Sequence, residues 1–249
     1  MIRYFLSMQI YLPYFEGNFT SIIVQSPLMT YHLYLVEIKA LGNKAGHDRL
    51  MLKFLYICKA AQSKEGRTHM NIETSRLILK DYTKNDFKYY WQLKSTEKVW
   101  EYSTFSPYKN EQEASVNFNK MLTSLRDNPY HFAALWTKED GHFIGEAGIL
   151  SLNQYTNRCV VGYNLLPGYW NLGYATEITK ALVSYAFEDI GIERVEALAM
   201  SLNIASCKVL EKSGFTLEGI LRHFTKIKDK YYDVCYYSII SSDFFIDFI

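Results

Sequence analysis

The 249-residue sequence has few of the residues and spacings that mark metal-binding, disulfide-rich or strongly charged proteins. Its four cysteines lie far apart and form no CxxC pair, which argues against a zinc knuckle, a thioredoxin-type redox pair and a disulfide-dense secreted fold. No histidines have HxxxH or HxH spacing, so no metal site is expected. Lysine plus arginine (27) balance aspartate plus glutamate (26), which leaves no global charge to hold nucleic acid. We therefore expect a reduced, cytoplasmic protein that does not bind nucleic acid.

A long hydrophobic run is also missing. Residues 22–36 carry no formal charge, but polar residues and Pro27 interrupt them, and the run is shorter than the roughly 20 apolar residues of a membrane span. Arg3 is the only basic residue before Glu16, so neither a signal peptide nor a membrane partner is expected. What is present is an ordinary globular mixture with 49% hydrophobic, 21% charged and 16% aromatic residues.

The chain divides into two parts of different character. Residues 1–69 hold eight basic and four acidic residues and no motif, and they end in a polar, linker-like stretch before Met70. We expect an N-terminal extension of unknown role, with a strand over 29–41 and a short helix over 50–61. It is either a poorly ordered segment, joined to a chain that naturally begins at Met70, or an accessory element that caps the domain or binds a partner. Residues 70–249 are expected to form the functional domain.

Hydrophobic periodicity becomes clear from Met70 onward. The order is strands first, then strand–helix–strand–helix, then a hairpin, which predicts a mixed α/β sheet with helices on both faces. The expected strands cover residues 76–80, 131–136, 143–150, 159–166, 194–200 and 231–240, and the expected helices cover 86–93, 111–126, 175–189 and 204–212.

The turn between a buried strand and an amphipathic helix, residues 165–177, carries the most chemical information. The first turn of a helix has free backbone N–H groups and a partial positive charge, and a diphosphate needs such donors on a concave surface. Gly173 leaves room for phosphates to approach the backbone; the alternative is that it only permits close packing of the helix on the strand. The turn has neither the Lys-Ser/Thr pair of a Walker loop nor a GxGxxG pattern.

Two blocks of the sequence carry a family resemblance. The first comprises 162–167, 169–170 and 173–177, and the second comprises 194–197, 203–206, 210–215, 218–219 and 221–222. In this order and spacing they resemble the GNAT superfamily of N-acetyltransferases, and the first block is similar to its acetyl-CoA-binding motif. The resemblance is strongest to the branch that acetylates the N-terminal alanine or serine of ribosomal proteins. Residues 73–79 also resemble the start of that branch, so the resemblance covers about residues 70–240.

The resemblance implies a fold in which the strand ending at Leu166 and the strand over 194–200 splay apart to hold acetyl-CoA, the co-substrate. The implied reaction is direct attack by an amine on the thioester, with no acyl-enzyme. Ser206 would face the sulfur and give a proton to the leaving thiolate through water. Asn203 would bond the pantetheine arm, or only cap its helix. The other implied acetyl-CoA contacts are backbone groups of Leu165, Leu166, Asn171, Leu172, Gly173, Tyr174 and Ala175.

Three positions depart from the wider family. Trp170 stands where Arg or Gln is frequent, although Trp occurs in the branch named above. Leu210 replaces a tyrosine acid, which moves the proton-donor role to Ser206, unless Ser206 is simply a helix-surface serine. Val160 replaces a glutamate of the branch, and Glu146 on the preceding strand is the nearest substitute as a base or water-holder; the alternative is a solvent-facing strand carboxylate.

The resemblance leaves the acceptor open. The first reading is the N-terminal amine of a ribosomal or other protein, because a free α-amine is easier to deprotonate than a lysine amine. The second is a small amine such as a polyamine, an amino sugar or an antibiotic, and the third is a non-catalytic acyl-CoA-binding module. We expect a monomer or a homodimer. Acidic residues that would suit a polyamine are Glu97, Glu101, Glu111 and Glu113, and aromatic residues placed in the same loop region are Trp100, Tyr102, Phe105 and Tyr108.

Overall fold

The computed structural model describes residues 9–11, 19–25, 30–36, 70–125 and 130–246 of the chain. The chain divides into the units Met1–Phe54 and Leu55–Ile249. In the first unit, β1 (Gln9–Tyr11), β2 (Phe19–Gln25) and β3 (Thr30–Val36) pair antiparallel in that order. β3 confirms the strand expected over 29–41, β1 and β2 were not expected, and the helix expected over 50–61 lies outside the described residues. The domain boundary at Met70 stays a prediction.

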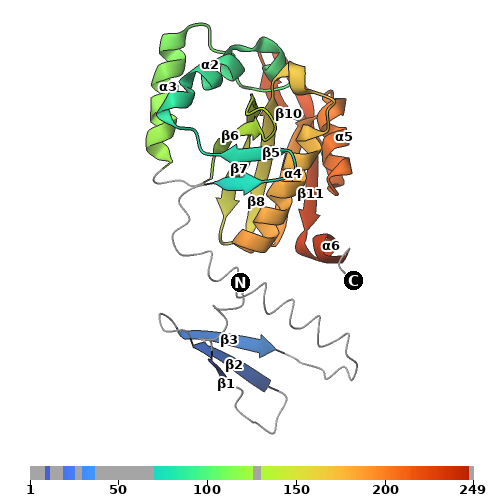
Figure 1. Cartoon of the computed structure of the whole chain (residues 1–249). Coiled ribbons are helices and arrows are strands. Elements are labelled where there is room, and N and C mark those ends of the chain that lie inside the picture. The colour runs from blue at the N-terminus through green and yellow to red at the C-terminus, as the bar shows by residue number, and fades with distance from the viewer. Residues whose placement is uncertain (1–8, 12–18, 26–29, 37–69, 126–129, 247–249) are drawn as a thin grey trace. The chain divides into compact units, whose positions relative to one another are not determined.

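The second unit is built on an eight-stranded sheet in the order β10-β11-β9-β8-β7-β6-β5-β4 (Figure 1). Neighbouring strands are antiparallel except for β8 and β9, which are parallel. This sheet confirms the predicted mixed α/β class. The strands are β4 (Asn71–Glu73), β5 (Leu77–Lys80), β6 (Phe132–Thr137), β7 (Phe143–Asn153), β8 (Arg158–Leu165), β9 (Arg194–Met200), β10 (Thr216–Ile227) and β11 (Lys230–Ile240).

Helices cover both faces of this sheet, as the sequence predicted. Alternate residues of β6 point to opposite sides: Ala133 packs in a cluster with residues of α4, whereas Ala134 packs in a cluster with residues of α2 and α3. Figure 1 shows α2 and α3 grouped together, apart from α4 and α5. The helices are α2 (Phe87–Ser95), α3 (Glu111–Ser124), α4 (Tyr174–Ser184), α5 (Ile204–Lys212) and α6 (Ser241–Ile246), with a π-helical segment (Tyr185–Ile190) after α4.

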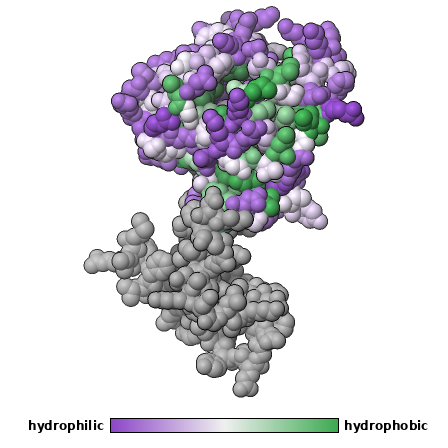
Figure 2. Space-filling view, turned by 90° about the vertical axis from the view of Figure 1, so that its right-hand side faces the viewer, coloured by the Kyte–Doolittle hydropathy of each residue, from purple (hydrophilic) through white to green (hydrophobic). Residues whose placement is uncertain are grey.

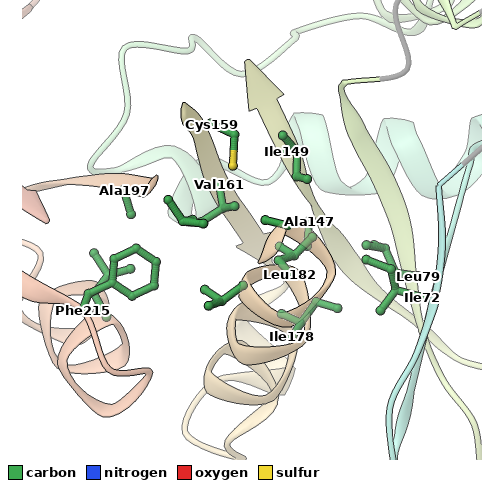
Figure 3. Packing of buried hydrophobic residues seen from close by; sticks show 14 of the residues in the cluster. Ile72, Leu79, Ala147, Ile149, Cys159, Val161, Ile178, Leu182, Ala197 and Phe215 are labelled. Atoms are coloured by element: carbon green, nitrogen blue, oxygen red, sulfur yellow. The ribbon is translucent and has the colours of Figure 1, made fainter. Parts of the chain in front are cut away.

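The larger core holds α4 against the centre of the sheet. Ile178 and Leu182 are fully buried, and Figure 3 shows them pointing toward Ala147 and Val161 on β7 and β8. Burying side chains of this size contributes roughly 1.5–3 kcal/mol each to folding. This packing fixes the start of α4 beside the end of β8, where the sequence placed the phosphate-binding turn.

The β10–β11 hairpin forms one edge of the sheet and keeps apolar side chains at the surface. Ile220 and Phe224 on β10 are 54% and 58% exposed. On the face shown in Figure 2, apolar side chains lie among polar ones rather than being confined to the interior. This edge lies next to β9, so it flanks the region where β8 and β9 separate.

Candidate active site

β8 and β9 separate after a short stretch of pairing. Their parallel register covers only the pairs from Arg158↔Arg194 to Val160↔Glu196, although β8 continues to Leu165 and β9 to Met200. The remaining length of β8 therefore has a free hydrogen-bonding edge on the side of β9. This is the splayed arrangement that the resemblance implied.

The amide of Leu165 points to this free edge. Leu166 N donates to Ile144 O (2.9 Å) on β7, and donors alternate in direction along an antiparallel ladder. The Leu165 N–H therefore points away from β7, toward the side where β9 diverges. Of the two amides proposed from the sequence, that of Leu166 is already bonded, whereas that of Leu165 has no acceptor among the residues that the structure describes. Trp170 Nε1 donates to Leu165 O (2.7 Å), so this indole fixes the end of the strand.

The turn between β8 and α4 is exposed and rich in unused donors. Residues 171–173 are exposed, and the backbone nitrogens of 171–175 donate to no acceptor within the described part of the chain. Asn171 (φ 60°) and Gly173 (φ 81°) both adopt left-handed backbone, which Asn tolerates and Gly prefers. These N–H groups at the start of α4 can receive an anionic group such as a diphosphate.

An arginine and a glutamate hold this turn in place, and the sequence analysis did not identify the pair. Arg76 Nη1 donates to Leu172 O (3.1 Å), and Arg76 Nε lies 2.6 Å from Glu177 Oε2. Glu177 Oε1 also accepts from Thr74 Oγ1 (2.6 Å) and Ser75 Oγ (3.0 Å). Burial would raise the pKa of Glu177, but these hydrogen bonds outweigh burial and hold its pKa at about 2. The partners are about a hundred residues apart, so no local pattern could reveal them.

Ser206 lies at the start of α5 with a phenol beside it. Asn203 Oδ1 accepts from Ser206 N (3.1 Å), which shows that Asn203 caps this helix. The hydroxyl of Tyr163 donates to Ser206 Oγ (3.2 Å), and burial raises the pKa of Tyr163 to about 12. Tyr163 therefore stays protonated at neutral pH and can supply a proton to Ser206. Its position within the first motif block was the only signal for it in the sequence.

Glu146 is buried rather than solvent-facing, so that alternative from the sequence is wrong. Its side chain is 1% exposed, and Lys94 Nζ lies 2.7 Å from its Oε1. Asn164 Nδ2 donates to the same oxygen (2.8 Å), and the Tyr82 hydroxyl lies 3.5 Å from the other. Burial, followed by the nearby Glu146 charge, raises the pKa of Tyr82 well above its usual range, so this phenol stays protonated. Lys94, which the sequence did not indicate, neutralises Glu146.

The aromatic residues expected near the acceptor differ in their exposure. Trp100 is 6% exposed and donates from Nε1 to Leu93 O (3.0 Å), so it belongs to the core under α2. Phe105 and Tyr108 are half-buried against this cluster, whereas Tyr102 is 40% exposed. Only part of the predicted set therefore remains available to line a mouth.

A groove of about 740 Å³ runs between β4 and α4. It is lined in part by Thr74 and Glu177, which hold the turn, but by none of the site residues predicted from the sequence. Within the described ranges, no three His, Cys, Asp or Glu side chains come together as a metal site, and no helix there is long and apolar enough to cross a membrane.

Comparisons with known proteins agree with this geometry. The family model "Acetyltransferase (GNAT) domain" matches residues 76–216, more than half of the chain. The uncharacterized N-acetyltransferase YoaA of Bacillus subtilis is 28% identical over 169 residues, which cover 68% of this chain and 96% of YoaA. The putative ribosomal N-acetyltransferase YdaF of the same organism is 29% identical over 104 residues, 42% of this chain and 57% of YdaF.

Solved structures share the fold. The spermidine N-acetyltransferase of Vibrio cholerae, determined in complex with CoA and spermine, superposes with a TM-score of 0.61 at 20% identity, over 69% of this chain and 99% of that chain. The chain therefore belongs to the GNAT family and is an acetyl-CoA-dependent N-acetyltransferase.

Proposed function

We propose that the protein transfers the acetyl group of acetyl-CoA to the N-terminal α-amine of a protein, with a ribosomal protein as the expected class. The resemblance of residues 70–240 to the ribosomal branch supports this acceptor, as does the likeness to YdaF. The likeness to a spermidine N-acetyltransferase supports a small amine about as well. The choice between them rests on the chemistry of the site.

The state of Glu146 is the observation that favours an α-amine. Its carboxylate is buried and paired with Lys94, so it is a poor acceptor for a substrate proton. The amine of an acceptor that suits this site should therefore already be partly deprotonated at neutral pH. An α-amine with a pKa near 8 is roughly one-tenth neutral at pH 7, whereas an alkyl amine with a pKa near 10.4 is almost entirely charged.

The proposed reaction is direct attack without an acyl-enzyme. The neutral amine nitrogen forms a bond to the thioester carbonyl carbon, and the charge that develops on the carbonyl oxygen is stabilised by the Leu165 N–H. The carbon–sulfur bond then breaks, and the amine loses its extra proton to water. Ser206 gives a proton to the thiolate, directly or through water, and regains one from Tyr163, which is reprotonated by solvent that received the amine proton.

The remaining contacts follow from the free donors. The backbone N–H groups of residues 171–175 would take the diphosphate, and the free edge of β8 around Leu165 would bond the pantetheine arm. Asn203 would offer its amide nitrogen to the same arm, because its carbonyl oxygen caps α5. Glu146 was expected to act as a base or as a water-holder. The ion pair with Lys94 disfavours the role of base, and the hydrogen bond from Asn164 supports a third role, in which Glu146 holds Asn164 in place.

The test is release of free thiol from acetyl-CoA in the presence of different amines. Peptides that begin with alanine or serine should be turned over, and the same peptides with a blocked N-terminus should not. Preferred turnover of spermidine or an amino sugar would instead establish the small-amine alternative. Tight CoA binding without turnover of any amine would establish the acyl-CoA-binding module.

One observation supports the alternative that the acceptor is a polyamine. The four carboxylates expected near the mouth are exposed, and within the described residues none of them forms an ion pair. A polycation could therefore bind at the surface of this region. These residues are Glu97, Glu101, Glu111 and Glu113.

A further inference from the structure

The ammonium of Lys94 lies inside an aromatic cage. Its Nζ is 4.5 Å from the ring centroid of Trp100 and 5.1 Å from that of Phe105. The rings of Tyr90 and Phe132 each lie 5.5 Å away. Faces of aromatic rings attract cations, and rings gathered around one point form the kind of site that recognises alkylammonium groups.

A carboxylate completes the cage. Glu146 is 2.7 Å from the ammonium, and the Lys94 side chain is only 10% exposed. Rings and a buried carboxylate together offer both the apolar walls and the counter-charge that a desolvated alkylammonium requires. These rings and the carboxylate form a cation site, and the ammonium of Lys94 occupies it.

This cation site adjoins the expected reaction centre. Glu146 lies opposite Asn164 in the β7–β8 register, and its carboxylate accepts a hydrogen bond from that residue. Asn164 directly precedes Leu165, whose amide faces the free edge of β8. If an acceptor held near this edge carried a second cationic group, Glu146 would not be available as its counter-ion, because Lys94 already neutralises this carboxylate.

We infer that Lys94 is a specificity-determining residue that excludes polyamine acceptors by filling an alkylammonium slot; this inference rests on the proposed function. A lysine side chain carries its ammonium on a four-carbon stem, which is the same group as the aminobutyl arm of spermidine. The slot therefore takes either the lysine or the arm, but not both. Two ammonium groups sharing one carboxylate would also leave an uncompensated buried charge.

The first experiment compares acceptors for the wild-type protein. The ratio of kcat/KM for an alanine-headed peptide to that for spermidine should exceed about tenfold. Equal or better use of spermidine by the wild type would overturn the inference while leaving the acetyltransferase activity intact. This measurement needs no variant, so it can overturn the inference even where a substitution prevents folding.

The second experiment empties the slot. Lys94→Ala should bind n-butylamine at least about tenfold more tightly than the wild type, measured by calorimetry without acetyl-CoA, and should gain a similar factor in kcat/KM for spermidine. Lys94→Met refills the slot with an uncharged chain and should gain neither property. Lys88→Ala is the matched control, because Lys88 is an exposed lysine on the same helix.

A double variant tests the counter-charge. Lys94→Ala combined with Glu146→Gln should lose the gain in n-butylamine binding, since the cage then lacks its carboxylate. If the gain persists, or if Lys94→Ala shows none, the slot is not an alkylammonium site. Should Lys94→Ala be unstable, n-butylamine ought to raise its thermal unfolding midpoint, because a ligand of the native state stabilises it. Calorimetry does not depend on turnover, so a failure of the proposed acceptor is distinguished from a failure of this inference.

Discussion

Glu177→Gln probes the brace that holds the expected diphosphate turn. The carboxylate accepts hydrogen bonds from Thr74, Ser75 and the backbone N–H of Arg76, and it pairs with the guanidinium of Arg76. Glutamine keeps the size of the side chain but removes the charge, and one of its terminal atoms becomes a donor. The variant should therefore loosen the contact between the start of α4 and the segment that precedes β5.

The size of the effect follows from the pKa of Glu177, which falls from 4.5 to about 2. A shift of this size corresponds to an upper limit of about 3.4 kcal/mol. The Arg76 side chain is 48% exposed, so solvent screens the pair, and we expect a loss of only about 1–2 kcal/mol in the free energy of unfolding at pH 7.

The pH dependence gives the sharper test. The pKa of Glu177 is lower in the folded than in the unfolded protein, so its contribution is complete above pH 4.5 and is lost as the pH falls toward about 2. Urea unfolding at a series of pH values should show the gap between the wild type and Glu177→Gln closing over this window. Glu139→Gln, at an exposed position in the β6–β7 turn, should show no such gap. A gap that stays constant down to pH 2.5 would refute the electrostatic reasoning.

Three further substitutions test the rest of the site and the core. Gly173→Val places a β-branched residue at φ 81°, with its Cβ 3.4 Å from Arg76 Nη2. Calorimetry should therefore show the affinity for CoA reduced by about tenfold or more, and unchanged affinity would contradict the diphosphate assignment. Ser206→Ala should lower kcat by about 100-fold with little change in KM for acetyl-CoA, and an unaltered kcat would exclude it as proton donor. Leu182→Ala, at a fully buried position, should lower the free energy of unfolding by about 2–5 kcal/mol, and a loss below 1 kcal/mol would mean that the core relaxes around it.

Local patterns predicted much of the fold because their signals lie within a few residues. β9 and α5 occupy the expected ranges 194–200 and 204–212, where Asn203 caps the helix and Gly214 follows its end. The edge strand β4 was missed because three residues show no periodicity. The helix expected over 175–189 instead becomes π-helical from Tyr185, a change that side-chain periodicity does not reveal.

The sequence by itself determined the family resemblance, the mixed α/β architecture and the position of the turn before α4, because each depends on motifs or periodicities that are continuous along the chain. Only the tertiary structure decided which side chains meet there. Lys94 reaches Glu146 across 52 residues, Tyr163 reaches Ser206 across 43, and Arg76 reaches Glu177 across 101. Whether a carboxylate is free or neutralised, and whether a serine has a proton donor, depends on such contacts. They form only when the sheet brings distant strands and helices within hydrogen-bond distance.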